Sequence, residues 1–239
     1  MKNKIICTLA FIVLVPFFSN AQLETEESNP LLPQQVELGA AIEFQTSKEG
    51  TENALPLSIE YGISRKLTVL VEPVAFTNIH PKVGTSTTGL GDLEITLFYQ
   101  LMSEKKSWIS MSLSGEVKLP VANNALIGTG KTDYTPFLIF SKTTGAFFTS
   151  ANLSYTFLGK PKGVNANNLF NYAIGTIYTL SPKSILFAEV FGNTSAFGGT
   201  DVPEGQAKTD IGTRTNTKEI SGGETVGSIG YGCYPGKNI

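Results

Sequence analysis

Cysteine and histidine are scarce in this chain of 239 residues, which contains two cysteines and one histidine. Cys7 lies inside the apolar part of a predicted signal peptide, away from the cleavage point, so no lipid anchor is expected and the mature chain keeps only Cys233. One cysteine and one histidine cannot supply the four ligands of a zinc site. A histidine-dependent hydrolase would need His80 beside a serine or an acidic residue, but we expect His80 to be a solvated loop residue before Pro81.

Net charge and long apolar segments are lacking as well. The formal net charge is −2 at pH 7 and the sequence has no basic stretch, which argues against a nucleic-acid partner. Beyond the N-terminus, no apolar run approaches the roughly 18 residues of a transmembrane helix. The sequence therefore excludes a helical membrane protein. It does not exclude a transmembrane β-barrel, because the apolar band of a barrel is diluted by its polar interior and its loops.

The N-terminus has the three parts of a secretory signal peptide. Lys2 and Lys4 come first, the apolar run of residues 5–18 follows, and the sequence SNAQ predicts cleavage after Ala21. We therefore expect residues 1–21 to be a signal peptide and the mature protein to be exported.

Two further segments are expected after the cleavage point. Residues 22–33, QLETEESNPLLP, are acidic and contain two prolines, and we expect them to form a mobile periplasmic N-terminal tail. No later change in composition suggests a domain boundary. Residues 34–239 are therefore predicted to form one domain, an outer-membrane β-barrel.

Apolar and polar side chains alternate along much of this domain, which is the period of a β-strand. Residues 93–101 place an apolar side chain at every second position, and residues 109–119 repeat the pattern after a short charged turn. Strands of nine or more residues with one apolar and one polar face are long for a small soluble sandwich. The pattern predicts eleven strands: 34–46, 55–63, 67–78, 89–102, 107–121, 133–142, 146–158, 169–181, 183–196, 216–222 and 225–234.

The links between these strands are alternately long and short. The long segments at 47–54, 79–88 and 122–132 are each followed by a short one, and the pattern continues to a link of about 20 residues around 197–215. Outer-membrane barrels have short periplasmic turns and long outside loops, whereas a soluble sandwich has no reason to place every long loop at one end. Aromatic residues near the strand ends are also typical of the girdles at a membrane interface.

The sequence therefore predicts an all-β protein, an antiparallel up-and-down transmembrane β-barrel whose apolar strand face contacts lipid. A closed sheet is the one way for strands to satisfy their backbone hydrogen bonds in a membrane. Bacterial single-chain barrels have an even number of strands, and eleven are counted here. Because the final CYPGKN is typical of the start of a loop, we expect twelve strands with the last one missing from the chain; the alternative is a count that is wrong by one.

Several segments carry a family resemblance: LPLSIEYGISRKLTVLVEPV, TGLGDLEITLFYQL, VKLPVANNALIGTGKTDYTPFLIFSK and NLSYTF. Their order and spacing resemble the outer-membrane proteins grouped as the meta-pathway of phenol degradation or "transporter" family. The GLGD that opens a strand and the LP…GTG…D segment are the usual marks of that family. The resemblance covers the chain from Leu55 to about residue 235. It implies a porin-like barrel that admits hydrophobic compounds, without fixing a substrate.

Charged residues on the polar strand faces are the candidates for the barrel lumen: Glu60, Glu72, Asp92, Glu94, Glu116, Lys118, Lys142 and Glu189. Two interpretations of them stay open. They form a mixed-charge lining that sets the selectivity of a pore, or they form interior salt bridges that plug a closed barrel. Glu72 and Glu189 share their faces with apolar residues, which favours a narrow or partly apolar interior.

We expect no catalytic residues, no metal and no cofactor. The GTGKT at 128–132 lacks the first glycine of a phosphate-binding loop, because Ala125 takes its place, and no helix is expected to follow. Asp92 and Asp133 could bind calcium near the loop mouths, but turn hydrogen bonds are the expected role. The chain also offers no set of nucleophile, base and orienting residue, so an enzyme is not expected.

Two functions follow from these predictions. The first is a channel for passive uptake of small, hydrophobic or aromatic solutes, with the long link at 197–215 at its mouth. The alternative is a closed barrel with a structural or ligand-binding role and no conduction. The partners expected in either case are outer-membrane lipid and the barrel insertion machinery, and the channel adds a small-molecule solute.

Overall fold

The computed structural model describes residues 25–46, 50–124, 126–162, 165–194, 196 and 224–233. The predicted signal peptide and the predicted strand at 216–222 lie outside these residues. No helix in the described ranges is long and apolar enough to cross a membrane. The strands are β1 (Val36–Ala40), β2 (Glu43–Thr46), β3 (Gly50–Ser64), β4 (Leu67–Pro81), β5 (Thr87–Gly89), β6 (Leu93–Met102), β7 (Ser110–Leu119), β8 (Asp133–Thr144), β9 (Phe147–Thr156), β10 (Leu169–Ser181), β11 (Ser184–Asn193) and β12 (Glu224–Cys233).

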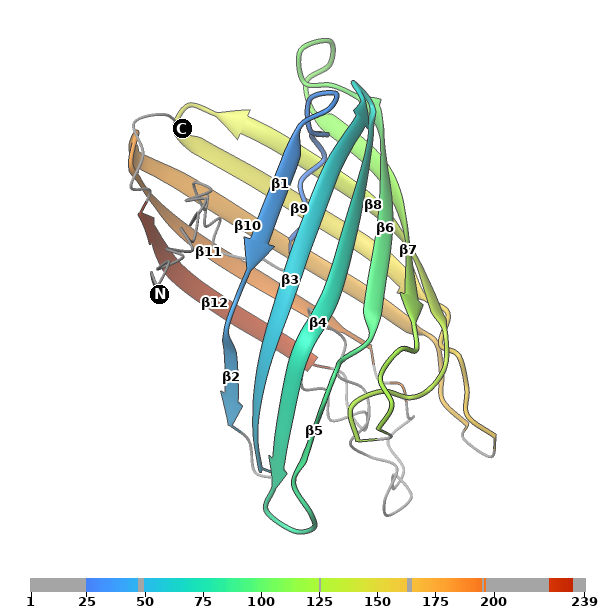
Figure 1. Cartoon of the computed structure of the whole chain (residues 1–239). Helices are drawn as coiled ribbons and strands as arrows, with labels where there is room; N and C mark the ends of the chain where they lie inside the picture. Colours follow the sequence, from blue (N-terminus) through green and yellow to red (C-terminus); the bar gives the residue numbers. More distant parts are fainter. Residues whose placement is uncertain are drawn as a thin grey trace, which may run out of the picture.

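All of these strands belong to one antiparallel sheet that curls into a half-barrel (Figure 1). The continuous path through the sheet is β1-β3-β4-β6-β7-β8-β9-β10-β11-β12. β2 pairs with the first residues of β3, and β5 pairs with the last residues of β4, so these two short strands lengthen the sheet without widening it. The predicted all-β, antiparallel, up-and-down architecture is confirmed, with β1 and β12 as the edges of the described sheet.

Short turns and long links lie at opposite ends of the sheet (Figure 1). The upper end in Figure 1, which we call the short-turn end, carries residues 65–66, 103–109, 145–146 and 182–183. At the lower end, the long-link end, β7 ends and β8 begins, β9 ends and β10 begins, and Asn193 of β11 lies opposite Glu224 of β12. The predicted alternation of long and short links holds from residue 120 onward, whereas the earlier turn at 103–109 is longer than the link at 82–86. The loops predicted at 47–54 and 79–88 are shorter than expected, because β3 and β4 run through much of them as strands of 15 residues.

The last strand ends at the short-turn end, whereas the prediction that CYPGKN opens a loop after eleven strands implies an end at the long-link end. β12 pairs with β11 over ten register positions, from Ser184 opposite Cys233 to Asn193 opposite Glu224. It therefore returns to the short-turn end, where β1 begins. The prediction counted an additional strand, at 216–222, between β11 and β12. One extra strand reverses the direction expected for the strand that follows it.

The two faces of the sheet differ in the way that the alternation predicts. On the convex face, large apolar side chains stand exposed; Leu97 in the middle of β6 is 47% exposed. On the concave face, polar side chains such as Thr96 and Ser112 are buried. Among the described residues, 10 hydrophobic and 22 polar or charged residues are buried, so the interior is mainly polar. A soluble globular domain has the opposite distribution.

Exposed aromatic residues gather near both ends of the strands. Near the long-link end, the rings of Tyr155 and Phe157 lie 5.1 Å apart, and near the short-turn end those of Phe147 and Tyr178 lie 4.7 Å apart. Trp108, in the turn between β6 and β7, is also exposed. Two bands of aromatic residues with an aliphatic zone between them are typical of a barrel surface at a membrane.

Candidate functional site

The register of the sheet brings four charged residues of the concave face into one row. Glu72 of β4 is the register partner of Glu94 of β6. Lys118 of β7 follows, with Glu94 on one side and Asp133 of β8 on the other. All four residues are buried. Because a row of the ladder runs across the strands, residues far apart in sequence form one charged band toward the long-link end.

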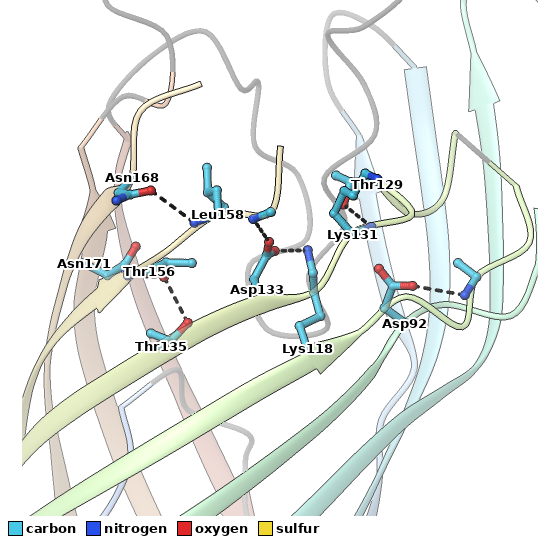
Figure 2. Close-up of polar contacts among 12 residues, drawn as sticks. Asp92, Lys118, Thr129, Lys131, Asp133, Thr135, Thr156, Leu158, Asn168 and Asn171 are labelled. Atoms are coloured by element: carbon cyan, nitrogen blue, oxygen red, sulfur yellow. Dashed lines mark hydrogen bonds and ion pairs between the residues drawn. The ribbon is translucent and has the colours of Figure 1, made fainter. Parts of the chain in front are cut away.

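Two aspartates tie the long links to the rim of the sheet (Figure 2). Lys118 and Asp133 form a buried ion pair with Nζ and Oδ2 2.5 Å apart. The other carboxylate oxygen of Asp133 accepts a hydrogen bond from the backbone N–H of Gly159 at 2.7 Å. Asp92 accepts one from the backbone N–H of Ala122 at 3.0 Å. Both aspartates thus bind links distant in sequence, and not their own turns as was predicted. The described residues contain no cluster of three or more acidic, histidine or cysteine side chains that could hold a metal ion.

The interior becomes partly apolar toward the short-turn end. Glu116 lies on β7 two residues from Lys118, in the next inward-facing row toward the short-turn end. Its Oε2 accepts a hydrogen bond from the Thr96 hydroxyl at 3.5 Å. An apolar cluster follows, made of Leu70, Phe98 and Ile139 with Phe137 packed against it. The partly apolar interior predicted from the faces of Glu72 and Glu189 is present.

The segment of residues 25–32, which we call the strap, crosses the concave face near the short-turn end. Thr25 contacts β11, Ser28 contacts β7 and β8, and Leu31 contacts β4, so the strap runs across the strands. The sequence led us to expect a mobile tail over residues 22–33, and it did not indicate these contacts.

Hydrogen bonds hold the strap along its length. Glu189 Oε2 accepts from both the backbone N–H and the hydroxyl of Thr25, at 2.7 and 2.6 Å. Ser112 Oγ donates to the backbone carbonyl of Ser28 at 2.6 Å. Further bonds, at 2.5 to 3.1 Å, join Ser150 Oγ to the carbonyl of Glu26, the N–H of Ser28 to Ser141 Oγ, Ser110 Oγ to Asn29 Oδ1 and the N–H of Leu31 to Thr68 Oγ1. Side chains of the sheet thus satisfy backbone groups of the strap, as buried polar groups require.

A groove of small residues makes room for the strap. One register row contains Ser110, Ser141, Ser150 and Gly175, and it continues to Glu189 and Ser228. A Cβ atom on Gly175 would lie 2.9 Å from the Thr25 hydroxyl and 3.2 Å from Thr25 Cβ. A Cβ on Gly62 would overlap the backbone carbonyl of Leu32. The absence of side chains at these two glycines is therefore what lets the strap lie against the sheet.

A cavity of about 410 Å³ lies beside the strap. Four carboxylate residues line it: Glu26 and Glu27 of the strap, Glu37 of β1 and Glu60 of β3. Glu37 and Glu60 are direct register partners across β1 and β3. Phe98, Ile177, Ile185 and Phe187 supply apolar lining, and its described lining includes no lysine, arginine or histidine. The cavity therefore combines an acidic side with an apolar side.

Seven of the eight predicted lumen residues lie on the concave face: Glu60, Glu72, Asp92, Glu94, Glu116, Lys118 and Glu189. Lys142 does not join them. Its neighbour Ser141 is buried on the concave face, and successive side chains of a strand point to opposite faces. Lys142 instead pairs with Glu104 of the turn at 103–109, with Nζ and Oε1 2.7 Å apart. The Lys142 ammonium and the N–H of Thr143 hold the pKa of Glu104 below its ordinary value.

The remaining candidates for chemistry lie at the surface. His80 is exposed at the end of β4, a strand position and not the predicted loop; its Nδ1 lies 2.7 Å from Ser86 Oγ and its Nε2 lies 3.1 Å from Asn78 Nδ2. If the Asn78 amide donates to Nε2, the ring proton sits on Nδ1 and points at Ser86, so the ring cannot take the serine proton. The GTGKT segment at 128–132 lies in the link between β7 and β8 and opens no helix.

Comparison with known families agrees with this architecture. A family model described as "Putative MetA-pathway of phenol degradation" matches residues 34–223, which is most of the chain. The chain belongs to this family. No curated protein matches it. The match begins two residues after the end of the strap and spans β1 to β11, so it covers the described sheet except β12.

Proposed function

We propose that this member of the phenol-degradation family is an outer-membrane β-barrel that lets small solutes cross passively. The observation that carries the proposal is the inverted distribution of side chains: apolar residues stand exposed on the convex face, and mostly polar residues are buried on the concave face. Burying polar groups while exposing leucine and phenylalanine is unfavourable in water. It is favourable where the outer surface meets lipid and the inner one meets water.

The arrangement of links supports the same orientation. Four short turns lie at one end and the long links at the other, which matches the periplasmic and external ends of a barrel in the outer membrane. The predicted signal peptide provides the export that this location needs. The long links would then stand outside the cell, tied to the rim through Asp92 and Asp133.

Small, partly apolar solutes, aromatic ones among them, are the proposed cargo. The interior offers an apolar cluster around Phe98 and a cavity whose lining includes Phe187 and the carboxylates of Glu37 and Glu60. Such a surface suits a compact molecule with an apolar body, and the family description points to phenolic compounds. We propose diffusion and not catalysis, because the sequence offers no set of nucleophile, base and orienting residue.

A closed barrel without conduction is the second candidate, and the strap favours it. Residues 25–32 occupy part of the concave face, and the buried Lys118–Asp133 pair occupies another part. In this arrangement the protein would serve as a structural element or bind a ligand in the cavity beside the strap.

Conductance of the refolded mature protein in a planar bilayer tests the first candidate. Steady ohmic steps are expected, with cation preference because acidic residues predominate on the concave face. Glu60→Gln should reduce that preference, since Glu60 lines the cavity. The matched control is Tyr61→Phe, at the next position and exposed on the convex face, which should leave ion selectivity unchanged. Silence from protein shown to be folded and inserted, with the strap both present and deleted, would contradict the proposal.

A further inference from the structure

The strap fits the sheet too specifically to be an unattached tail. Its hydrogen bonds come from six strands that span the described sheet from β4 to β11. Most of these partners are serine or threonine hydroxyls that bind backbone groups of the strap. Two glycines of the concave face, Gly62 and Gly175, lie where a side chain would collide with the strap. The concave face thus provides a seat for eight residues that lie outside the matched family region.

The seat is held by contacts that water can replace. Thr25, Ser28 and Asn29 of the strap form hydrogen bonds to the sheet, and their partners on the concave face are also polar. Exchanging such bonds for bonds to water changes the free energy by only about 0.5–1.5 kcal/mol each, and by about 1.5–3 kcal/mol where one partner is charged. A segment held in this way can leave its seat without unfolding the sheet, whose strands are paired independently of it.

We propose that the strap is a gate: seated across the short-turn end it closes the passage, and the passage opens when the strap leaves its seat. This inference rests on the proposed channel function. The principal anchor is Glu189, whose Oε2 receives both bonds from Thr25. The strap begins a few residues after the predicted cleavage point, so its release at the Thr25 end would free the N-terminus of the mature chain to swing away from the groove.

A reversible covalent lock tests the gate. In a Cys233→Ser background, the pair Thr25→Cys and Gly175→Cys tests this by disulfide formation. A Cβ on Gly175 would lie 3.2 Å from Thr25 Cβ, so a shift of the strap by a few tenths of an ångström brings the two atoms to the separation of about 3.5–4.5 Å found in disulfides. The readout is bilayer conductance of the same preparation after oxidation with diamide and after reduction. The control pair is Thr149→Cys and Thr176→Cys, register partners on the convex face with hydroxyls 3.1 Å apart.

The gate predicts loss of conductance in the oxidised strap-lock protein, recovery on reduction, and no redox effect in the control pair. Deletion of residues 22–32 should give channels that stay open in both conditions. Equal conductance of the locked and reduced protein would overturn the gate and leave the channel standing. A Gly175→Cys side chain that displaces the strap should by itself raise the conductance, so failure of the cysteines to link in folded protein without such a rise would also overturn the gate. If every form is silent, the strap-deleted one included, the proposed channel itself is wrong.

A point variant separates gating from a merely structural role of the strap. Glu189→Gln keeps the shape of the anchor but removes its charge, and should raise the fraction of time spent open by about tenfold, since a bond to a charged group contributes more than a neutral one. Ser228→Ala is the control, because Ser228 donates to Glu189 Oε1 without touching the strap. Conductance steps of unchanged size with a changed open fraction support the gate; an unchanged open fraction in Glu189→Gln contradicts it.

Discussion

Replacing one apolar residue of the convex face by arginine measures directly whether that face meets lipid. Leu97 is the middle one of the five outward-pointing residues of β6, and it is 47% exposed. An arginine at the midplane of a transmembrane barrel costs about 2–4 kcal/mol, and near an interface about 0–1 kcal/mol. The same substitution at an exposed position of a soluble protein usually changes stability by less than about 0.5 kcal/mol.

Leu101 provides the matched control on the same strand and the same face, at 41% exposed. It lies four residues nearer the short-turn end, which is about 13 Å along the strand and about 10 Å along the membrane normal for a strand tilted by about 40°. An apolar band about 25 Å tall places Leu101 near its edge. Leu97→Arg should therefore cost about 2 kcal/mol more than Leu101→Arg, roughly a thirtyfold difference in the folding equilibrium.

The assay is reversible unfolding in denaturant from phospholipid vesicles, followed through the fluorescence of Trp108, the single tryptophan of the chain. Both variants keep this probe. Equal costs for Leu97→Arg and Leu101→Arg, or costs below about 0.5 kcal/mol for both, would refute the assignment of the convex face to lipid.

Two further predictions concern charged pairs. Lys118→Met leaves the buried carboxylate of Asp133 without its ion-pair partner and should lower the free energy of unfolding by about 3–5 kcal/mol. Adding Asp133→Asn, whose side-chain oxygen can still accept the hydrogen bond from the Gly159 N–H, should restore part of this loss. No recovery in the double variant would contradict the ion pair. The pKa of Glu104 is lowered in the folded protein, so its pairing with Lys142 stabilises above the unfolded pKa and is lost as the pH falls through the folded one. The destabilisation caused by Glu104→Gln in unfolding titrations should accordingly shrink from pH 7 to pH 3; a loss that stays the same would contradict it.

The fold was predictable because one simple signal repeats along the chain. A period of two residues identified each of the described long strands. The lengths of the links indicated which strand ends lie together at one end of the sheet. Lys142 shows where this reasoning fails. It was grouped with the lumen as a charged residue in a predicted strand, but one position decides the face, and its neighbour Ser141 takes the concave side. The phase of that strand has to be counted from Ile139, which is buried, and not from charge.

The strap was not predictable, because its seat exists only in the assembled sheet. Ser110, Ser141, Ser150 and Gly175 are separated in sequence by links and strands, and they form a groove only through the register of four successive strands. The strap itself has no period that would indicate a strand or a helix. A serine on a polar strand face predicts only an inward position. Once the strand register is known, residues of small size fall on one row across the strands. This is the sequence signal that could have indicated the seat of the strap.

The open and closed interpretations of the interior need not describe different proteins. A barrel of about eight strands is filled by its own side chains, and wider ones leave room for ligands or a channel. A wall ten strands wide therefore has limited spare space, and here a segment of eight residues lies across it beside a cavity of about 410 Å³. The charged row from Glu72 to Asp133 lies nearer the long-link end, away from the strap. Removing the strap would thus widen the short-turn end without disturbing the buried ion pair, so the two candidate functions become two positions of one segment, and the disulfide lock decides between them.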